Sequence, residues 1–145
     1  MKDDKFLVPV AVHLFLMNQE QILMLRRYNT GFEDGNYSLV AGHLDGGETV
    51  IQAMIREARE EAGISISAEN LEISLVMQRK STVERIDYFL FCTKWNGEIQ
   101  NMEPHKCDNI EWFPIDKLPA NTIPYIREAI SKYLAGEKFA IFGFN

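Results

Sequence analysis

The sequence has little cysteine and no paired cysteine motif. Only Cys92 and Cys107 are present in the 145 residues, and no Cys-x-x-Cys pair occurs. A secreted domain stabilised by disulfides carries more cysteines than this, whereas two isolated thiols are typical of a protein in a reducing compartment. The sequence therefore predicts a cytoplasmic protein with two reduced cysteines.

The chain also lacks a long apolar run and an excess of positive charge. Its first residues, Met-Lys-Asp-Asp-Lys, include acids and lead into only about ten apolar residues, which Pro9 and His13 interrupt. This segment is neither a signal peptide nor a membrane span. With 15 Lys and Arg against 21 Asp and Glu, the formal net charge is −6, which argues against non-specific binding of nucleic acid. Neither a membrane nor a nucleic acid is expected as a partner.

What the sequence does contain is the composition of an ordinary globular domain. Hydrophobic residues make up 46% of the chain and charged residues 25%. A length of 145 residues suits one domain with a real core. No internal repeat, low-complexity stretch or linker divides the chain, so we expect a single domain over residues 1–145.

Strand-like runs and two helical patterns alternate along the chain. Strands are expected at residues 6–17, 22–25, 37–41, 71–77, 85–95 and 110–114, and helices at 49–62 and 123–134. The polar segments 29–36, 78–84 and 101–108 are expected to be loops or turns. The apolar segment 138–144 is interpreted either as an added strand or as a docking segment. This alternation predicts the α/β class.

The helix expected at 49–62 has clear start and stop signals. Thr49 followed by Gln52 fits a capping box, and Gly63 fits a left-handed C-terminal cap. Apolar residues with helical spacing form a stripe that we expect to be buried: Ile51, Met54, Ile55, Ala58 and Ala62. At about 100° per residue, Glu57, Glu60 and Glu61 lie together on a different face.

Two interpretations of this acidic face are open from the residues alone. It can be a solvated charged face, with Arg56 and Glu60 as an i,i+4 ion pair. It can instead be a site for a hard divalent cation such as Mg²⁺, which takes oxygen ligands from carboxylates, substrate phosphate and water. The surrounding pattern decides between them.

That pattern extends well beyond the acidic face. Gly42 is followed after five residues by Glu48, after seven more by Arg56-Glu57, and then by an aliphatic residue, a variable residue, Glu60-Glu61, one residue, Gly63 and Ile64. This matches the Nudix box in full, so the chain resembles the Nudix hydrolase (MutT-related) family. The chain departs from the commonest family sequence at Ala58, which replaces a larger aliphatic residue, and at Val40-Ala41, which replaces Pro-Gly. Neither departure removes a ligand.

The resemblance implies a fold, an activity and a cofactor. The Nudix fold is a mixed β-sheet sandwiched between helices, and it would cover nearly the whole chain. The family activity is metal-dependent hydrolysis of a diphosphate linkage, with Mg²⁺ or Mn²⁺ as the cation. The implied enzyme is a pyrophosphohydrolase that acts on the acid anhydride of a small-molecule nucleoside diphosphate derivative.

The match to the box also implies roles for individual helix residues. Glu57, Glu60 and Glu61 are expected to bind the metal, and either Glu57 or Glu61 is expected to act as the general base. Arg56 is expected to orient these carboxylates through charge-assisted hydrogen bonds.

Further metal-shell residues are expected outside the helix. Gly42 and Glu48 are assigned to this shell by the same match, although an acid at the position of Glu48 is also favoured by the helix dipole alone. A last ligand in MutT-like members comes from a loop after a long strand. Glu103 is the first choice for it, ahead of three competitors: Glu98, Asp108 and Glu111.

The remaining candidates are expected to contact the rest of the substrate. Arg26 and Arg27 close a predicted strand where many Nudix proteins place an arginine that reaches phosphate; either can equally be solvated. Leu118-Pro-Ala-Asn121 resembles the segment from which MutT-like hydrolases present an asparagine to a purine base, because an amide is both donor and acceptor. The alternative is that Asn121 caps the second helix. His43 is interpreted as a loop residue without a chemical role.

These resemblances favour a nucleoside triphosphate as substrate, with an oxidised one such as 8-oxo-dGTP as the first choice. ADP-ribose and sugar nucleotides are the alternatives within the same chemistry. A nucleotide-sensing module without catalysis is disfavoured by the complete set of box glutamates. A prenyl-diphosphate isomerase is disfavoured because it needs a catalytic cysteine, which neither Cys92 nor Cys107 clearly offers. A homodimer is left open.

Overall fold

The computed structural model describes residues 4–144, and its main element is a mixed sheet of eight strands. The strands are β1 (Val10–Asn18), β2 (Gln21–Arg27), β3 (Tyr37–Ser38), β4 (Ala41–His43), β5 (Glu72–Lys80), β6 (Glu84–Cys92), β7 (Cys107–Pro114) and β8 (Phe139–Phe142). Their order is β3-β2-β1-β6-β5-β8, with β4 paired to β1 and β7 paired to β2. Two helices, α1 (Val50–Ala62) and α2 (Pro124–Leu134), and a 3₁₀ turn, η1 (Ala68–Asn70), complete the fold. The predicted α/β class is confirmed.

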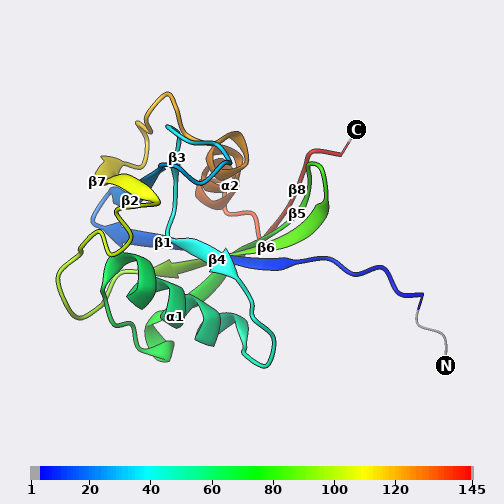
Figure 1. Ribbon diagram of the computed structural model, residues 1–145, viewed down its shortest axis with the longest axis horizontal. Helices are drawn as coiled ribbons and strands as arrows, with labels where there is room; N and C mark the ends of the chain where they lie inside the picture. Colours follow the sequence, from blue (N-terminus) through cyan, green and yellow to red (C-terminus); the bar gives the residue numbers. More distant parts are fainter. Residues whose placement is uncertain (1–3, 145) are drawn as a thin grey trace.

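The two helices lie on opposite faces of the sheet (Figure 1). Met54 and Ala58 of α1 belong to one cluster of buried apolar residues. Ile126 and Ile130 of α2 belong to a second cluster on the other face. Because each helix buries its own apolar stripe against the sheet, the sheet is sandwiched between them as expected.

The predicted caps of α1 are both present. The Thr49 hydroxyl accepts a hydrogen bond from the Gln52 backbone N–H at 3.0 Å, and the Gln52 side chain accepts one from the Thr49 N–H at 2.9 Å. Gly63 has a φ of 71°, in the left-handed region where a Cβ is unfavourable. The helix therefore begins and ends where its sequence signals predict, within one residue.

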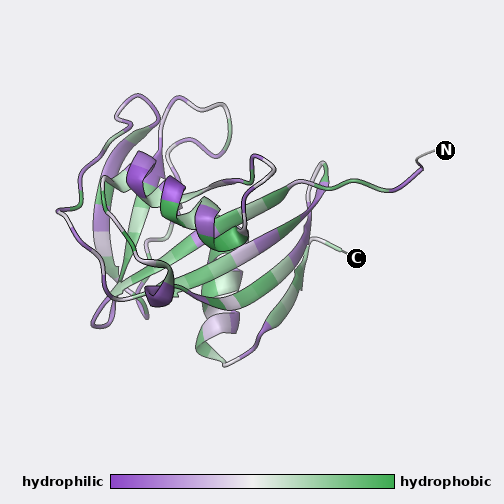
Figure 2. Cartoon of the chain, turned by 90° about the horizontal axis from the view of Figure 1, so that it is seen from below, coloured by the Kyte–Doolittle hydropathy of each residue, from purple (hydrophilic) through white to green (hydrophobic). Residues whose placement is uncertain are grey.

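The buried face of α1 is shifted relative to the predicted stripe. Hydrophilic and hydrophobic bands alternate along the helix (Figure 2). Ile51 and Ile55 are only partly buried, whereas Ala53 is fully buried and was not predicted to be. Glu57 also lies on the buried side of the helix, so one of the predicted ligands is largely shielded from solvent.

Several strand boundaries differ from the expectation. The segment 78–84 was predicted to be a turn, but β5 and β6 stay paired through Arg79↔Arg85 and Lys80↔Glu84, so only residues 81–83 connect them. Polar side chains do not prevent pairing because the ladder is made by backbone groups. The first strand begins at Val10 rather than residue 6, and the strand predicted at 85–95 ends at Cys92.

The C-terminal half resolves one open alternative and corrects one boundary. Segment 138–144 contains β8, which pairs in parallel with β5, so it is an added strand. β7 begins at Cys107, three residues earlier than predicted, and shortens the expected 101–108 loop.

The centre of the sheet fixes the box in place. β1 pairs in parallel with β6 and in antiparallel fashion with β4, where Val12 lies opposite Gly42. β4 is followed by a short loop and then by α1, so the strand and helix of the box are both held against β1 (Figure 1). A site built on these elements is therefore anchored to β1, which pairs with three other strands.

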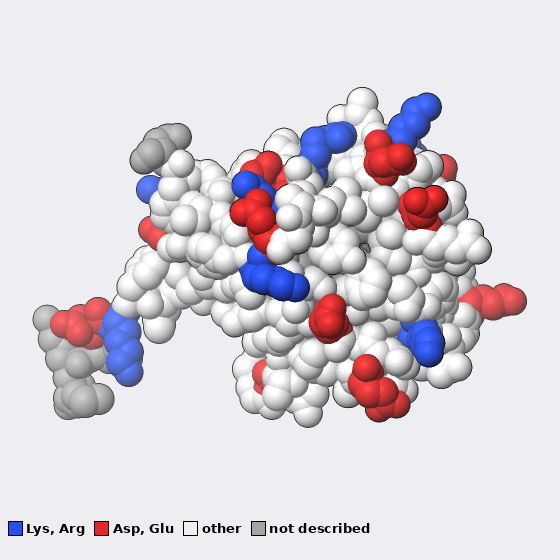
Figure 3. All heavy atoms as spheres, turned by 180° about the vertical axis from the view of Figure 1, so that it is seen from behind, with Lys and Arg blue, Asp and Glu red and all other residues white. Residues whose placement is uncertain are grey.

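The described residues bear on three further expectations. Within residues 4–144, no helix has the length and apolar character needed to cross a membrane. On the face seen in Figure 3, the described Lys and Arg side chains lie in separate groups interspersed with Asp and Glu. Cys92 and Cys107 are both buried free thiols.

Candidate active site

A cavity of about 490 Å³ lies between the acidic face of α1, the central strands and the loop that follows β2. This volume falls in the range of sites for small molecules. Its lining includes five acidic residues: Asp45, Glu57, Glu60, Glu61 and Glu103. It also includes five basic residues: Arg26, Arg27, Arg79, Arg85 and Lys106. One hollow therefore combines groups suited to a cation with groups suited to an anion.

Glu57 lies directly beneath the glycine of the box. It is only 9% exposed, and burial raises the pKa of its carboxyl although Arg56 opposes this. A Cβ added to Gly42 would overlap the Glu57 carboxyl group. Glycine is therefore needed at position 42 for the Glu57 carboxylate to occupy this place. The match to the Nudix box assigned Gly42 to the metal shell, and this contact gives the residue a physical role there.

This close approach gives a specific prediction. Gly42→Ala should displace the Glu57 carboxylate and lower divalent-metal affinity and turnover, by about 10- to 100-fold if the effect equals that of losing a supporting group. The fold should change little, because the overlapping atoms are the end of a flexible side chain. Metal titration and steady-state kinetics would measure the loss. In a Glu57→Ala background, adding Gly42→Ala should cost nothing further; an additive loss would show that Gly42 acts through some other group.

Glu61 lies one turn further along the same face. One of its oxygens accepts a hydrogen bond from the backbone N–H of Ala41 at 3.0 Å. Burial raises the pKa of Glu61 to about 8, and the charges of Glu57 and Glu103 raise it further against the effect of that hydrogen bond. A carboxyl group whose pKa lies near neutral pH is suited to exchange a proton or to bind a cation.

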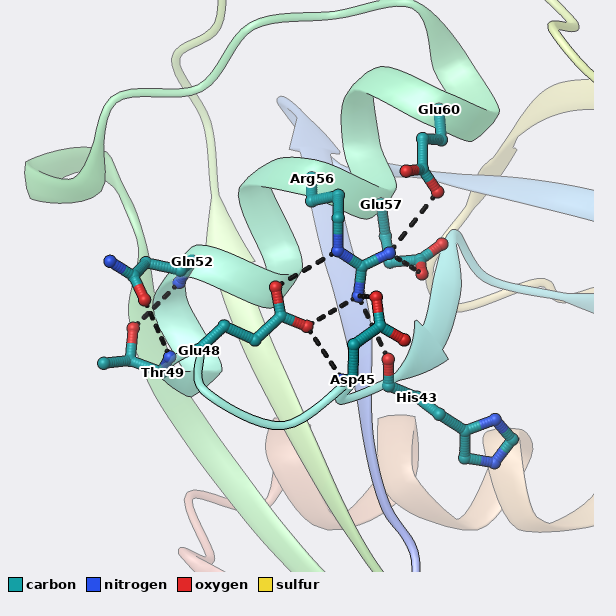
Figure 4. A network of polar contacts seen from close by, with 8 residues as sticks. All are labelled: His43, Asp45, Glu48, Thr49, Gln52, Arg56, Glu57 and Glu60. Carbon is teal, nitrogen blue, oxygen red and sulfur yellow. Dashed lines mark hydrogen bonds and ion pairs between the residues drawn. The ribbon is translucent and has the colours of Figure 1, made fainter.

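Arg56 is the centre of the polar network beside these carboxylates (Figure 4). Its Nε and Nη2 donate to the two oxygens of Glu48 at 3.1 and 2.7 Å, in a bidentate pair. Its Nη1 donates to Glu57 at 2.7 Å and to Glu60 at 3.4 Å, and Nη2 also reaches the backbone carbonyl of His43 at 3.1 Å. The predicted orienting role of Arg56 agrees with these contacts.

Glu48 and Glu60 differ in their surroundings. Glu48 also accepts a hydrogen bond from the Asp45 N–H at 3.0 Å, and its contacts with Arg56 hold its pKa below the usual value. It does not line the cavity. The Glu60 side chain is 52% exposed and lines the cavity. Glu48 is thus placed to hold Arg56, and Glu60 is placed to meet a ligand.

The bidentate geometry leads to a second prediction. Arg56→Lys keeps the positive charge, but a lysine cannot form the bidentate pair with Glu48 and also donate a hydrogen bond to Glu57. We expect turnover to fall by about 10- to 100-fold and thermal stability to fall measurably, because the four carboxylates that pair with Arg56 then share a weaker partner. Arg59→Lys, one turn along on the exposed side of α1, is the matched control and should leave both unchanged. An Arg56→Lys variant equal to wild type in both measurements would contradict the orienting role.

The carboxylates line one cavity without forming a preassembled cage. Among residues 4–144, no three His, Cys, Asp or Glu side chains stand together as a ready cation site. Ionised carboxylates repel each other, and Arg56 and the Ala41 N–H occupy some of their oxygens. The donor set nevertheless fits a hard cation, because it consists of oxygen atoms and burial disfavours the charged forms of Glu57 and Glu61 until a cation compensates.

Of the four acids proposed for the loop ligand, only Glu103 lines the cavity. It is also near enough to raise the pKa of Glu57 and Glu61 by its charge. Asp108 is instead paired with Arg26 at 2.7 Å, and Glu111 accepts a hydrogen bond from Asn109 at 2.9 Å. The sequence-based preference for Glu103 is therefore supported by position.

The two strand-end arginines both line the cavity but have different partners. Arg26 forms the ion pair with Asp108, which raises its pKa. Arg27 donates through Nε to the Phe32 carbonyl at 2.7 Å and through Nη2 to Thr30 at 3.1 Å. Arg27 thus holds the 29–36 loop and keeps its charge free of any carboxylate partner among residues 4–144.

Asn121 does not cap α2, and its side chain contacts the 29–36 loop. It does not line the cavity, and its side-chain N–H donates to the Gly35 carbonyl at 2.7 Å. The helix-cap alternative is wrong, because the N-cap of α2 is Ile123 and no side chain bonds to it. A contact between Asn121 and a purine base remains a prediction. In this structure, the hydrogen bond of Asn121 connects the segment that precedes α2 to the 29–36 loop.

A buried polar cluster on the inner wall was missed from the sequence. Asp87 is fully buried between His13, at 3.0 Å, and Arg79, at 2.6 Å. Burial alone would raise the pKa of Asp87, but hydrogen bonds from His13 and Arg79 lower it to about 2. The Arg79 guanidinium lies 3.5 Å from the ring centroid of Tyr125, in a cation–π contact. Only the interruption of an apolar strand by His13 signalled this cluster.

His43 also lines the cavity, with its ring directed away from the Arg56 network (Figure 4). Burial lowers its pKa, and the charge of Arg85 lowers it further. His43 is the last residue of β4 rather than a loop residue, its carbonyl accepts a hydrogen bond from Arg56, and its ring lies 3.5 Å from Arg85. That it has no chemical role stays a prediction.

This geometry agrees with the family comparison. The family model of the NUDIX domain matches residues 7–133. The chain belongs to the Nudix hydrolase family. Members of this family typically use a divalent metal, which agrees with the oxygen-rich donor set of the cavity.

Curated Nudix relatives are similar over part of their length. An NAD-capped RNA hydrolase NudC from Stutzerimonas stutzeri is 31% identical over 121 residues, which is 83% of this chain and 41% of the relative. The human 8-oxo-dGDP phosphatase NUDT18 is 28% identical over 131 residues, covering 86% and 39%. The chain thus spans about two fifths of the length of these two relatives.

Solved Nudix structures share the fold. The crystal structure of a MutT NUDIX hydrolase from Burkholderia pseudomallei superposes with a TM-score of 0.80 at 23% identity, covering 87% of this chain and 98% of that one. A mixed sheet sandwiched between helices, as expected for the Nudix fold, is therefore confirmed.

Proposed function

We propose that this protein hydrolyses the diphosphate linkage of a small-molecule nucleotide in a reaction that depends on Mg²⁺ or Mn²⁺. The observation that carries the proposal is that Glu57, Glu60, Glu61 and Glu103 line one nucleotide-sized cavity together with Arg27 and Arg85, which have no carboxylate partner among residues 4–144. A solvated charged face would not bury Glu57 or raise the pKa of Glu61 to about 8.

Different residues of the cavity would serve different steps of phosphoryl transfer. Such a reaction needs the substrate to be positioned and its spread negative charge to be neutralised. When bound, a divalent cation supplies Lewis-acid polarisation of a phosphoryl oxygen and lowers the pKa of a coordinated water. Glu57, Glu60, Glu61 and Glu103 would hold the cation, with Gly42 leaving room for Glu57. Arg56, backed by Glu48, keeps the Glu57 and Glu60 carboxylates in place.

Of the two candidates for the general base, the contacts favour Glu61. Arg56 donates to Glu57 at 2.7 Å, which reduces the basicity of that carboxylate, whereas Glu61 accepts only a neutral backbone N–H. A base is most effective when its pKa lies near the working pH. Arg27, which has no carboxylate partner among the described residues, is the better placed of the two strand-end arginines to receive phosphate, because Arg26 is paired with Asp108.

We propose a nucleoside triphosphate as the substrate class. The similar proteins include the human 8-oxo-dGDP phosphatase and an oxidized purine nucleoside triphosphate hydrolase from Danio rerio, which is 28% identical over 108 residues. An ADP-ribose pyrophosphatase from Methanocaldococcus jannaschii, 36% identical over 62 residues, keeps ADP-ribose as the alternative.

A substrate panel tests this proposal. Nucleoside triphosphates, 8-oxo-dGTP, 8-oxo-dGDP, ADP-ribose and a sugar nucleotide would be incubated with and without Mg²⁺, and the released monophosphate, phosphate or pyrophosphate would be quantified. We expect Mg²⁺-dependent cleavage with the highest kcat/KM for a triphosphate. Cleavage of no diphosphate compound, or cleavage unaffected by EDTA, would contradict the proposal.

A further inference from the structure

Two buried side-chain nitrogen atoms lack a hydrogen-bond partner among residues 4–144, and both belong to residues that line the cavity. They are Nδ1 of His13 on β1 and Nε of Arg85 on β6. Buried polar atoms in native proteins are nearly always paired, and an unpaired one costs about 1–3 kcal/mol. Their location on one wall suggests that a polar ligand group supplies the missing partner.

Arg85 is the cationic member of this pair, and it lies opposite another arginine. Arg79 and Arg85 are direct partners in the β5–β6 ladder. Like charges directly opposite each other across a ladder are destabilising. Arg79 is neutralised by Asp87 at 2.6 Å, so its charge is accounted for.

Arg85 has no such compensation. It forms no ion pair with a carboxylate among the described residues. Its Nη1 lies 3.5 Å from Nε2 of His43, the last residue of β4 before the loop of the box. An uncompensated guanidinium with a buried, unpaired Nε is unfavourable in the free protein, and an anion on the cavity side would relieve both defects.

We propose that Arg85 is a phosphate-binding residue, which holds a phosphoryl group of the substrate on the wall facing the metal-binding glutamates. The guanidinium presents several N–H donors in a planar fork that matches phosphate oxygens. Its position beside the box loop brings it to the same cavity as Glu57 and Glu61 while it stands on a separate strand. This inference rests on the proposed function, because it assigns the anion to the substrate of that site.

The test uses inorganic pyrophosphate as the probe and EDTA to exclude metal. Binding would be measured by calorimetry and by thermal shift for wild type, Arg85→Gln, Arg85→Lys and Arg127→Gln. Arg127 is an exposed arginine of α2 outside the cavity wall and serves as the matched control. We expect Arg85→Gln to weaken pyrophosphate binding by about 10- to 100-fold, the range of one charge-assisted hydrogen bond, and Arg85→Lys to weaken it less.

The variants without ligand give an independent readout. Arg85→Gln should melt at the same temperature as wild type or higher, because it removes an uncompensated charge; a purely structural arginine would lower the melting temperature on removal. Arg127→Gln should bind pyrophosphate as wild type does. Wild-type affinity in Arg85→Gln, or no pyrophosphate binding by wild type without metal, would overturn the inference.

The outcomes separate this inference from the proposed function. If wild type binds pyrophosphate through Arg85 but cleaves nothing in the substrate panel, the proposed hydrolysis fails and the anion site stands. If wild type cleaves nucleotides and Arg85→Gln does so with unchanged KM and unchanged pyrophosphate affinity, the anion site fails and the proposed hydrolysis stands.

Discussion

Replacing Glu60 by glutamine is expected to lower metal-dependent turnover by at least about 100-fold, more than the loss of a supporting group costs. Glutamine keeps the shape of the side chain but removes the charge that a hard cation requires. Stability should stay the same, because Glu60 is 52% exposed and its contact with Arg56 is long, at 3.4 Å. Steady-state kinetics with saturating Mg²⁺ and a thermal unfolding curve would measure both quantities.

Glu69→Gln is the matched control for this experiment. Glu69 is an exposed glutamate in η1 and does not line the cavity. Its replacement makes the same change in net charge and should leave turnover unchanged. Wild-type turnover in Glu60→Gln would contradict its assignment as a metal ligand, and equal losses in both variants would indicate a general effect of charge.

Glu61 is expected to make the metal-free protein less stable as pH rises. Its pKa is about 8 in the folded protein against 4.5 for an unperturbed glutamate, so the folded state binds more protons between these values. The free energy of unfolding should therefore be highest below about pH 4.5 for this group and fall as pH rises to about 8. Glu61→Gln should remove this slope and be more stable than wild type at pH 9, by up to about 5 kcal/mol.

Denaturant unfolding in EDTA from pH 5 to pH 9 would measure this slope for both proteins. Glu61→Gln should also lose turnover, because a neutral amide is neither a good metal ligand nor a base. Mg²⁺ should stabilise wild type more at pH 9 than at pH 6, since cation binding must displace the Glu61 proton at the lower pH. A pH-stability profile that is identical in wild type and Glu61→Gln would show that the pKa of Glu61 is not raised in the folded protein.

The acidic helix was predictable because its signals are local. The capping box of Thr49 and Gln52 and the left-handed Gly63 both lie within a few residues of the groups they satisfy. The spacing from Gly42 to Glu61 encodes a strand, a loop and a helix that follow one another directly, so one short motif specifies most of one cavity wall. In this chain, the close fit of Glu57 beneath Gly42 is a physical reason for a glycine at the first position of the motif.

The opposite wall was not predictable because its partners are distant in the sequence. His13 and Asp87 are 74 residues apart and meet only because β1 and β6 pair in parallel. Arg79 was assigned to a turn because its segment is polar, and Arg85 was assigned to the start of the next strand. Only the β5–β6 ladder shows that they face each other. Asn121 was expected at a helix cap or at substrate, but it bonds to Gly35 across 86 residues.

A crystal structure with Mn²⁺ and a non-hydrolysable nucleotide, in which a methylene group replaces the bridging oxygen, tests the central claim most directly. The anomalous signal of Mn²⁺ would locate the cation without ambiguity. We predict Mn²⁺ within about 2.0–2.5 Å of oxygens from at least two of Glu57, Glu60 and Glu61, with the diphosphate bridging to it. Mn²⁺ and nucleotide bound away from α1, with these carboxylates still contacting only Arg56, Ala41 and solvent, would contradict the account.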